Sequence, residues 1–405
     1  NIEKAKGYYA VTLPEMKIVD ADESVTTIGM IAINASPTEK PKNWKMAVAL
    51  PMPIVTNDKQ GEKINQIDIG KQQFIGIYDE DIKNFSKLAV SYDDVKFSNY
   101  TDNVIIDTKN MSIISDLQVA NKTLSGPTDI VLKNITLADT DTNKITTIKE
   151  IEMVAEYDGL DIISLVQNNY NFDLKKLGGI KFKGEVKDIE SDFKLSKIEF
   201  EYDGEKPKNG ISDQKVKIKY DGLKSINKNQ NMVEFIPTDM NLNFDFNKLP
   251  IEQLIKLGQM KNSSEKTPSA AMNMLQIMTS LPIKMTNAGT NIQIDNFDFR
   301  NEMYSIITRG NLKADAESPL MMIGNIDLET TGLDKTETAL NAKLPNASKQ
   351  ERSAIQQAIN KINFVQSKCA GKNGSYKCNL VANKEGKIML NKTEITMMEA
   401  LQLIK

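Results

Sequence analysis

The spacing of apolar residues changes within Met240-Asn-Leu-Asn-Phe-Asp-Phe-Asn-Lys-Leu-Pro250-Ile-Glu-Gln-Leu-Ile255. Up to Leu249 apolar and polar residues alternate, which is the pattern of a β-strand with one apolar face. After Pro250 the apolar residues recur at helical spacing, and a second, Met-rich helix is predicted over residues 269–281. This stretch is therefore expected to supply the apolar helices against which the surrounding strands curl.

Most of the remaining sequence alternates like a half-buried antiparallel sheet. In the clearest pair, Glu199 and Glu201 of one strand are expected to face the lysines of the next strand, Lys215, Lys217 and Lys219. The predicted fold class is mainly β (α+β). We expect a long, curved antiparallel β-sheet with a few short helices packed in or over its concave apolar face.

Three regions are predicted along the chain. Residues 1–115 form a β-rich N-terminal domain, and residues 116–285 an antiparallel β region with a helical segment at 250–281. Residues 286–405 form a C-terminal β region with a helix near 349–363, where Ser348 and Glu351 make a capping box, and a hairpin at 369–378.

Composition excludes several classes of function. The 405 residues include no histidine, which removes histidine-based catalysis and histidine-ligated metals. A formal net charge of -3 gives no broad positive field for nucleic acid. The acid pairs Asp79/Asp81 and Asp93/Asp94 are interpreted as solvated turns rather than as acid-base machinery. We therefore predict no enzymatic activity, no cofactor and no nucleic-acid partner.

The two cysteines flank Asn373-Gly374, a strong signal for a two-residue hairpin turn. Counting outward from that turn places Cys369 opposite Cys378 on a non-hydrogen-bonded pair, where a disulfide can form. The alternative is two reduced thiols on the same hairpin. A disulfide implies an oxidising compartment, so the expected location is periplasmic or otherwise extracytoplasmic.

No stretch approaches the ~20 apolar residues needed to span a bilayer. The chain opens at Asn1 without a methionine, and a removed N-terminal signal or membrane anchor is expected.

Two groups of residues are candidates for binding. The apolar residues of the two helices are candidates for a hydrophobic ligand groove, because methionine adapts to changing surfaces; the alternative is a helix buried under the sheet. These groove candidates are Leu254, Ile255, Met274, Leu275 and Met278. The second group, Asp139, Asp141, Asn143 and Glu150, has the spacing of calcium ligands, although a polar hairpin loop explains it better.

A family resemblance rests on the glycine-spaced strands between about residues 120 and 400. The segments that carry it are Ala288-Gly-Thr with Ile292, Ile294 and Phe297, Gly310-Asn-Leu-Lys-Ala-Asp315, Gly324-Asn-Ile-Asp-Leu328, Gly332-Leu-Asp334 and Gly386-Lys-Ile-Met-Leu-Asn391. In these the chain resembles uncharacterised bacterial envelope proteins of the YdgA and AsmA-like kind. The resemblance implies a periplasmic β-groove protein that handles lipid or helps to assemble the envelope.

The resulting functional hypothesis is a non-enzymatic cell-envelope protein. It would bind or shield a lipid-like ligand, or aid envelope assembly together with another envelope protein. The alternative is a scaffold or surface protein with a closed core that acts through protein contacts. An open apolar face would distinguish the first hypothesis from the second.

Overall fold

The computed structural model of the chain describes residues 1–120, 123–161, 178–226, 233–262 and 268–404. It divides into two compact units. Unit 1 comprises residues 1–170 and 178–198, and unit 2 comprises residues 171–177 and 199–405. The predicted class, mainly β with an antiparallel sheet and a few short helices, is confirmed. The sequence-based divisions near residues 115 and 285 stay predictions.

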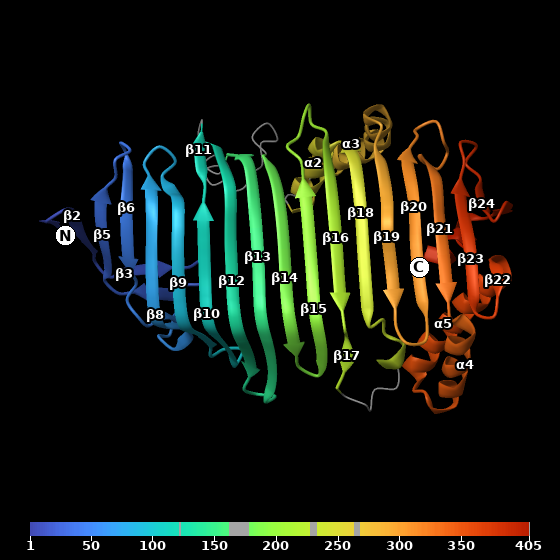
Figure 1. Ribbon diagram of the computed structural model, residues 1–405, viewed down its shortest axis with the longest axis horizontal. Coiled ribbons are helices and arrows are strands. Elements are labelled where there is room, and N and C mark those ends of the chain that lie inside the picture. Colours follow the sequence, from blue (N-terminus) through green and yellow to red (C-terminus); the bar gives the residue numbers. More distant parts are fainter. Residues whose placement is uncertain (121–122, 162–177, 227–232, 263–267, 405) are drawn as a thin grey trace. The chain divides into compact units, whose positions relative to one another are not determined.

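Unit 1 is built from antiparallel strands that follow one another along the sheet. The order of pairing is β1–β2–β5–β6–β8–β9–β10–β12–β13–β14. The bounds are β1 Ile2–Ala5, β2 Tyr8–Leu13, β5 Ile31–Pro37, β6 Asn43–Ala49, β8 Lys63–Asp79, β9 Asn84–Asn99, β10 Val104–Asp116, β12 Thr123–Asp139, β13 Lys144–Leu160 and β14 Gly179–Glu190. Figure 1 shows the long strands β8 to β14 side by side.

The sheet of unit 1 forks at β8, whose two halves pair with different strands. Its later half pairs with β6, and its earlier half with β7 (Ile54–Asn57). Strand β7 continues to β4 (Val25–Ile28) and β3 (Met16–Val19), while the short β11 (Gln118–Ala120) pairs with β12.

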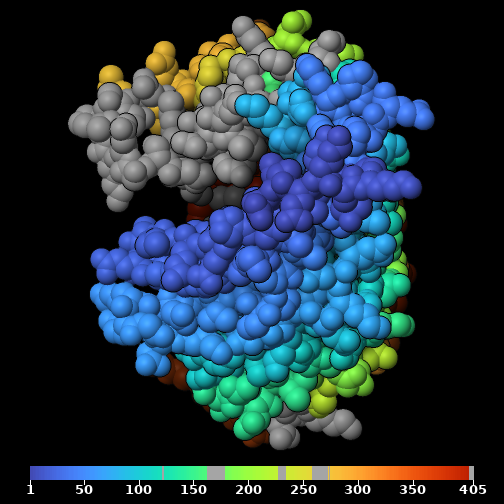
Figure 2. Space-filling model, turned by 90° about the vertical axis from the view of Figure 1, so that its left-hand side faces the viewer, coloured from blue at the N-terminus to red at the C-terminus, as the bar shows by residue number. Residues whose placement is uncertain are grey.

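Strand β1 forms the N-terminal edge and pairs with β2. Figure 2 shows the first strands, in dark blue, on the surface of this edge. The strand is only 4 residues long and includes Glu3 and Lys4, two features that discourage pairing with other chains.

A seam crosses six neighbouring strands of unit 1 at one level. One residue per strand is left out of the ladders there, and the seam comprises Gly70, Asp94, Lys109, Asn134, Lys149 and Asp188. Asp94, Asn134 and Asp188 have positive φ angles of 50, 51 and 49°. Asp and Asn tolerate this left-handed conformation better than other side chains, because their short polar groups can hydrogen-bond locally.

The seam keeps the apolar residues of these strands on one face. In β9, Val95 and Phe97 lie on one side of the seam and Val90 and Tyr92 on the other. Strict alternation would place the two pairs on opposite faces, since Val95 and Tyr92 are three residues apart. Because Asp94 is left out of the ladder between them, both pairs lie on the same face of the sheet. A β-bulge has the same effect on side-chain alternation.

Unit 2 continues the antiparallel pattern and adds helices. Its ladder runs β16–β18–β19–β20–β21–β23–β24–β25. The bounds are β16 Ser212–Asp221, β18 Asp239–Leu249, β19 Asn291–Arg300, β20 Ser305–Ala314, β21 Met322–Thr331, β23 Ser375–Ala382, β24 Ile388–Leu390 and β25 Thr393–Ile395. β15 (Phe193–Gly204) has residues in both units, and the short elements β17 (Lys224–Ser225) and η2 (Val233–Phe235) follow β16.

The described helices belong to unit 2. They are α2 Ile251–Asn262, α3 Pro268–Ala288, α4 Leu333–Lys343, η3 Leu344–Asn346, α5 Lys349–Lys368 and α6 Met397–Ile404. The capping box of Ser348 and Glu351 at the start of α5 is confirmed. Helix α3 continues past the predicted end, with Pro282 inside it. No helix among the described residues is long and apolar enough to cross a membrane.

The cysteine hairpin forms as predicted. β22 (Ala370–Lys372) pairs with β23 in the register counted from the turn, from Lys372 opposite Ser375 to Ala370 opposite Lys377. Asn373 and Gly374 have positive φ angles of 55 and 76°, which this tight turn requires. Cys369 and Cys378 are joined by a disulfide, with 4.9 Å between their Cα atoms.

Candidate hydrophobic-ligand site

One face of the unit 2 sheet is apolar across β16, β18, β19 and β20. Registered partners place Val216, Phe244, Ile294 and Gly310 in one row, and Ile218, Leu242, Phe297 and Thr308 in the next. Charged side chains are absent from these rows, and the apolar side chains in them are partly exposed rather than buried. The surface can therefore accept hydrocarbon without leaving a buried charge unpaired.

Four phenylalanines form the centre of this surface, and we call them the phenylalanine patch: Phe244, Phe246, Phe297 and Phe299. The rings of Phe297 and Phe299 meet edge to face with centroids 4.9 Å apart, and Phe244 lies 6.1 Å from both Phe246 and Phe297. A bulge in β19 at residues 295–296 keeps Ile294 and Phe297 on one face.

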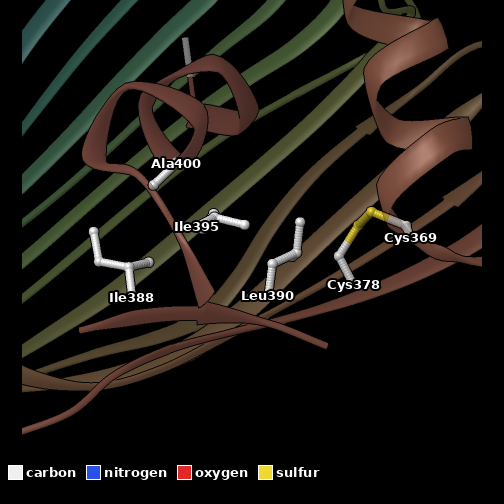
Figure 3. Close-up of a cluster of buried hydrophobic side chains, with 6 residues drawn as sticks. All are labelled: Cys369, Cys378, Ile388, Leu390, Ile395 and Ala400. Carbon is white, nitrogen blue, oxygen red and sulfur yellow. A yellow bond between two sulfur atoms is a disulfide. The ribbon is translucent and has the colours of Figure 1, made fainter. Parts of the chain in front are cut away.

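The same face is covered at its C-terminal end. Cys369, Cys378, Ile388, Leu390, Ile395 and Ala400 form a buried cluster, with Leu328 and Leu380 of the sheet against it. Figure 3 shows Ile388, Leu390 and Ile395 beside the short helix that carries Ala400 and the disulfide of Cys369 and Cys378. Leu390 is 2% exposed. A second buried cluster joins α4 and α5 and touches Tyr376 of β23.

Unit 1 carries a comparable apolar face. One row across it runs Val90, Ile113, Ile130 and Met153, and another runs Val95, Thr108, Ile135 and Ile148. Val90 and Ile135 are buried, whereas Ile113, Ile130, Met153 and Ile148 stay partly exposed. Among the described residues of unit 1 there is no helix to cover this face.

The groove candidates chosen from the sequence do not share one environment. Ile255 of α2 and Met274 of α3 are partly buried, while Leu254, Leu275 and Met278 are 36, 61 and 58% exposed. Figure 1 shows both helices near the upper ends of β16 and β18. Residues 263–267, within the predicted helical segment, lie outside the described residues. Whether these five residues hold a ligand stays a prediction.

The calcium candidates are separated by the hairpin. Asp139 accepts the backbone N–H groups of Asp141 and Thr142 at 2.9 and 3.0 Å. The Thr142 backbone bond holds the pKa of Asp139 below its usual range. Asn143, at the end of the turn, has a positive φ angle of 55°. Glu150 lies opposite Lys133, well along β13 from the turn, and pairs with lysines. Glu150 is therefore not brought to the turn that holds the other three residues.

The opposite faces of both sheets are wet and charged. Lys217 pairs with Glu201 at 3.5 Å and Lys219 with Glu199 at 3.7 Å, as the alternation predicted.

The acid pair Asp93/Asp94, interpreted from the sequence as a turn, instead lies inside β9 at the seam, where Asp94 pairs with Lys109 at 3.0 Å. A hollow of about 650 Å³ at the seam is lined by residues that include Lys109, Asn134 and Lys149.

A lysine-centred network on the wet face of unit 1 makes stability depend on pH. Lys187 contacts Glu150 at 2.7 Å and Glu185 at 2.9 Å, and Lys197 contacts Glu185 at 2.9 Å. Hydrogen bonds from Lys187 lower the pKa of Glu150, and bonds from Lys197 and then Lys187 lower that of Glu185, from 4.5. Such carboxylates stabilise the folded state above pH 4.5 and lose that contribution as pH falls through their folded pKa values.

Lys187→Met is therefore expected to destabilise the chain slightly at pH 7, because partly exposed ion pairs contribute little. The difference from the unaltered chain should shrink below pH 4.5, as measured by urea unfolding across the pH range. Lys45→Met, on an exposed position of β6, is the control. If the difference in unfolding free energy between Lys187→Met and the unaltered chain stays constant down to pH 3, the two carboxylates are not the source of the pH dependence.

Comparisons of the chain with family models, with curated proteins and with solved structures find no match.

Proposed function

We propose that the protein binds a lipid-like molecule on its uncovered apolar sheet surface, with the phenylalanine patch of unit 2 as the centre of the site. The observation that carries the proposal is the contrast along one face of one sheet. At its C-terminal end helices and a disulfide hairpin bury the apolar residues, whereas the residues over β16 to β20 stay partly exposed. A face built to be a core would be covered throughout.

The chemistry of the surface favours hydrocarbon as the ligand. Apart from Gly310 and Thr308, its rows contain aliphatic and aromatic side chains, and they hold no charged group, so a polar ligand would find few partners there. From Met240 to Phe246 the face extends about 20 Å along β18, which suits an extended chain more than a compact molecule. Unit 1 carries the same kind of surface, which supports a second binding site for the same chemical class of ligand.

A non-enzymatic role in an extracytoplasmic compartment, such as a bacterial periplasm, goes with this proposal. The disulfide between Cys369 and Cys378 is of the kind that persists in oxidising compartments. Lipid moving between membranes there has to be shielded from water, because exposed hydrocarbon costs about 0.8 kcal/mol per CH₂ group.

The test is native mass spectrometry of the purified chain, followed by denaturing lipid extraction. Phe244→Gln with Ile294→Gln places two amides in neighbouring positions of one row and should lower lipid occupancy about tenfold, which corresponds to about 1.4 kcal/mol. Ile307→Gln is the matched control. In β20, Ile306 pairs with Phe299 of the patch, whereas the next residue, Ile307, pairs with Asp298 on the opposite face.

Thermal unfolding establishes that each variant folds. Retained occupancy in the double variant, or equal loss in Ile307→Gln, would remove the patch as the site. An unaltered chain that carries no lipid and takes up no added phospholipid would sink the proposal.

A further inference from the structure

Helix α3 has almost no charge along its length. Its 21 residues, Pro268–Ala288, contain one charged side chain, that of Lys284. At about 100° per residue, Met274, Ile277, Leu281 and Met285 fall on one stripe, and all four are partly buried. This is the side through which α3 packs on unit 2.

A second apolar stripe of α3 is exposed. We call Met272, Leu275, Met278 and Ile283 the outer stripe; they are 72, 61, 58 and 54% exposed. The polar side chains follow a separate stripe, comprising Gln276, Ser280, Lys284 and Asn287. A surface helix normally turns polar residues toward water on its whole outer side. The polar stripe of α3 takes up only part of that side.

The polar group within the outer stripe is already satisfied. The Thr279 hydroxyl donates to the carbonyl oxygens of Leu275 and Gln276 at 3.0 and 3.1 Å. Thr286 likewise donates to the Pro282 carbonyl at 2.9 Å. Hydroxyls bonded to their own helix cost little to remove from water, which is how threonine is accommodated in apolar surroundings.

The position of α3 is fixed by its C-terminal end. Ala316 donates its N–H to the Thr286 hydroxyl oxygen at 2.8 Å, and Thr290, which follows the helix, donates to the Lys248 carbonyl at 2.7 Å. The outer stripe is thus presented by a helix tied to the sheet.

We propose that the outer stripe docks unit 2 on the surface of a lipid bilayer, lying in the interfacial plane; this rests on the proposed function, for which it names the membrane as source or destination of the ligand. The exposed area of the stripe is about 500 Å² by side-chain size, so a dimer through it would bury only about 1,000 Å², below a standard protein interface.

The charge of α3 also favours a lipid bilayer as the surface on which the outer stripe docks. With no carboxylate, α3 is not repelled by anionic headgroups, and its one cation, the exposed Lys284, belongs to the polar stripe that borders the outer stripe. Helices that lie in the interface carry cations on their polar face, and Lys284 is the one such residue of α3.

The experiment is co-sedimentation of the full chain with phosphatidylcholine vesicles, with and without added phosphatidylglycerol. The four-fold variant Met272→Ser, Leu275→Ser, Met278→Ser and Ile283→Ser should lower the partition coefficient more than tenfold. The control is Met321→Ser with Met322→Ser, which alters side chains that are 49 and 41% exposed outside the helix. It should bind as the unaltered chain does.

If the four-fold variant fails to fold, two pair variants (272 with 275, 278 with 283) replace it. Absent binding of the unaltered chain to both vesicle types, or equal loss in the control, overturns the proposal. So does a concentration-dependent dimer that the four-fold variant abolishes without any vesicle binding.

Lipid extraction from the same preparations separates the two proposals. A four-fold variant that keeps its extracted lipid but no longer sediments with vesicles supports docking as a step distinct from ligand binding. An unaltered chain that sediments with vesicles but never carries lipid supports docking and overturns the proposed function alone.

Discussion

Replacing Ile355 by alanine is expected to lower the free energy of unfolding of unit 2 by about 3 to 4 kcal/mol. The side chain is 1% exposed, at the centre of the cluster that joins α4 to α5, together with Leu340, which is 2% exposed. Truncation removes buried apolar area and leaves a cavity that rigid neighbours fill only in part. Urea unfolding followed by circular dichroism would measure the change.

The control is Gln357→Ala, an exposed position two residues further along α5. It should stay within about 0.5 kcal/mol of the unaltered chain, as exposed positions usually do. Equal losses in the two variants would mean that the cluster does not hold α5 in place.

Loss of the disulfide is the second large effect, expected to destabilise unit 2 by about 2 to 3 kcal/mol. The bond closes a short loop and therefore limits the unfolded chain. Its cysteines, 8 and 4% exposed, also belong to the buried cluster beside α6. The measurement is thermal unfolding of Cys369→Ala with Cys378→Ala beside that of the unaltered chain.

Reductant supplies the internal control for this prediction. Added to the unaltered chain it should reproduce the destabilisation, and added to the double alanine variant it should change nothing. If reductant leaves the unaltered chain as stable as before, the disulfide contributes no stability, and the hairpin is held by packing alone.

Features that depend on a few residues close together in the sequence were predictable. The register of the cysteine hairpin follows from Asn373-Gly374, because a two-residue turn fixes every pair counted outward from it. The cap of α5 follows from Ser348 and Glu351 three residues apart. The charge pairing between Glu199 and Lys219 needed only a strand pattern and a turn between the strands.

The seam was missed, although its signal is present in the sequence. In β9 the apolar spacing passes from two residues to three between Val95 and Tyr92. A single break of this kind looks like a turn, which is how Asp93 and Asp94 were interpreted. The breaks are seen to align only when the strands are placed beside one another, and no single strand contains that information.

The apolar character of α3 was predictable, but the side that packs was not, and the phenylalanine patch was not singled out from the sequence. The helix sequence shows that α3 is apolar, but the side that packs depends on tertiary contacts. Leu275 and Met278 thus came out exposed, whereas Met274 is partly buried. The helix also continues through Pro282, a residue that from sequence alone marks a helix end.

The aligned seam also bears on how the sheet finds its pairing during folding. Long strands of similar composition can slide past one another by two residues and still keep every apolar side chain on the correct face. In unit 1 such a slide would set an omitted residue against a regularly paired one on each neighbouring strand, and backbone groups on both would lose their partners. The six omitted residues therefore distinguish the native alignment from its shifted copies, a distinction that alternation alone cannot make.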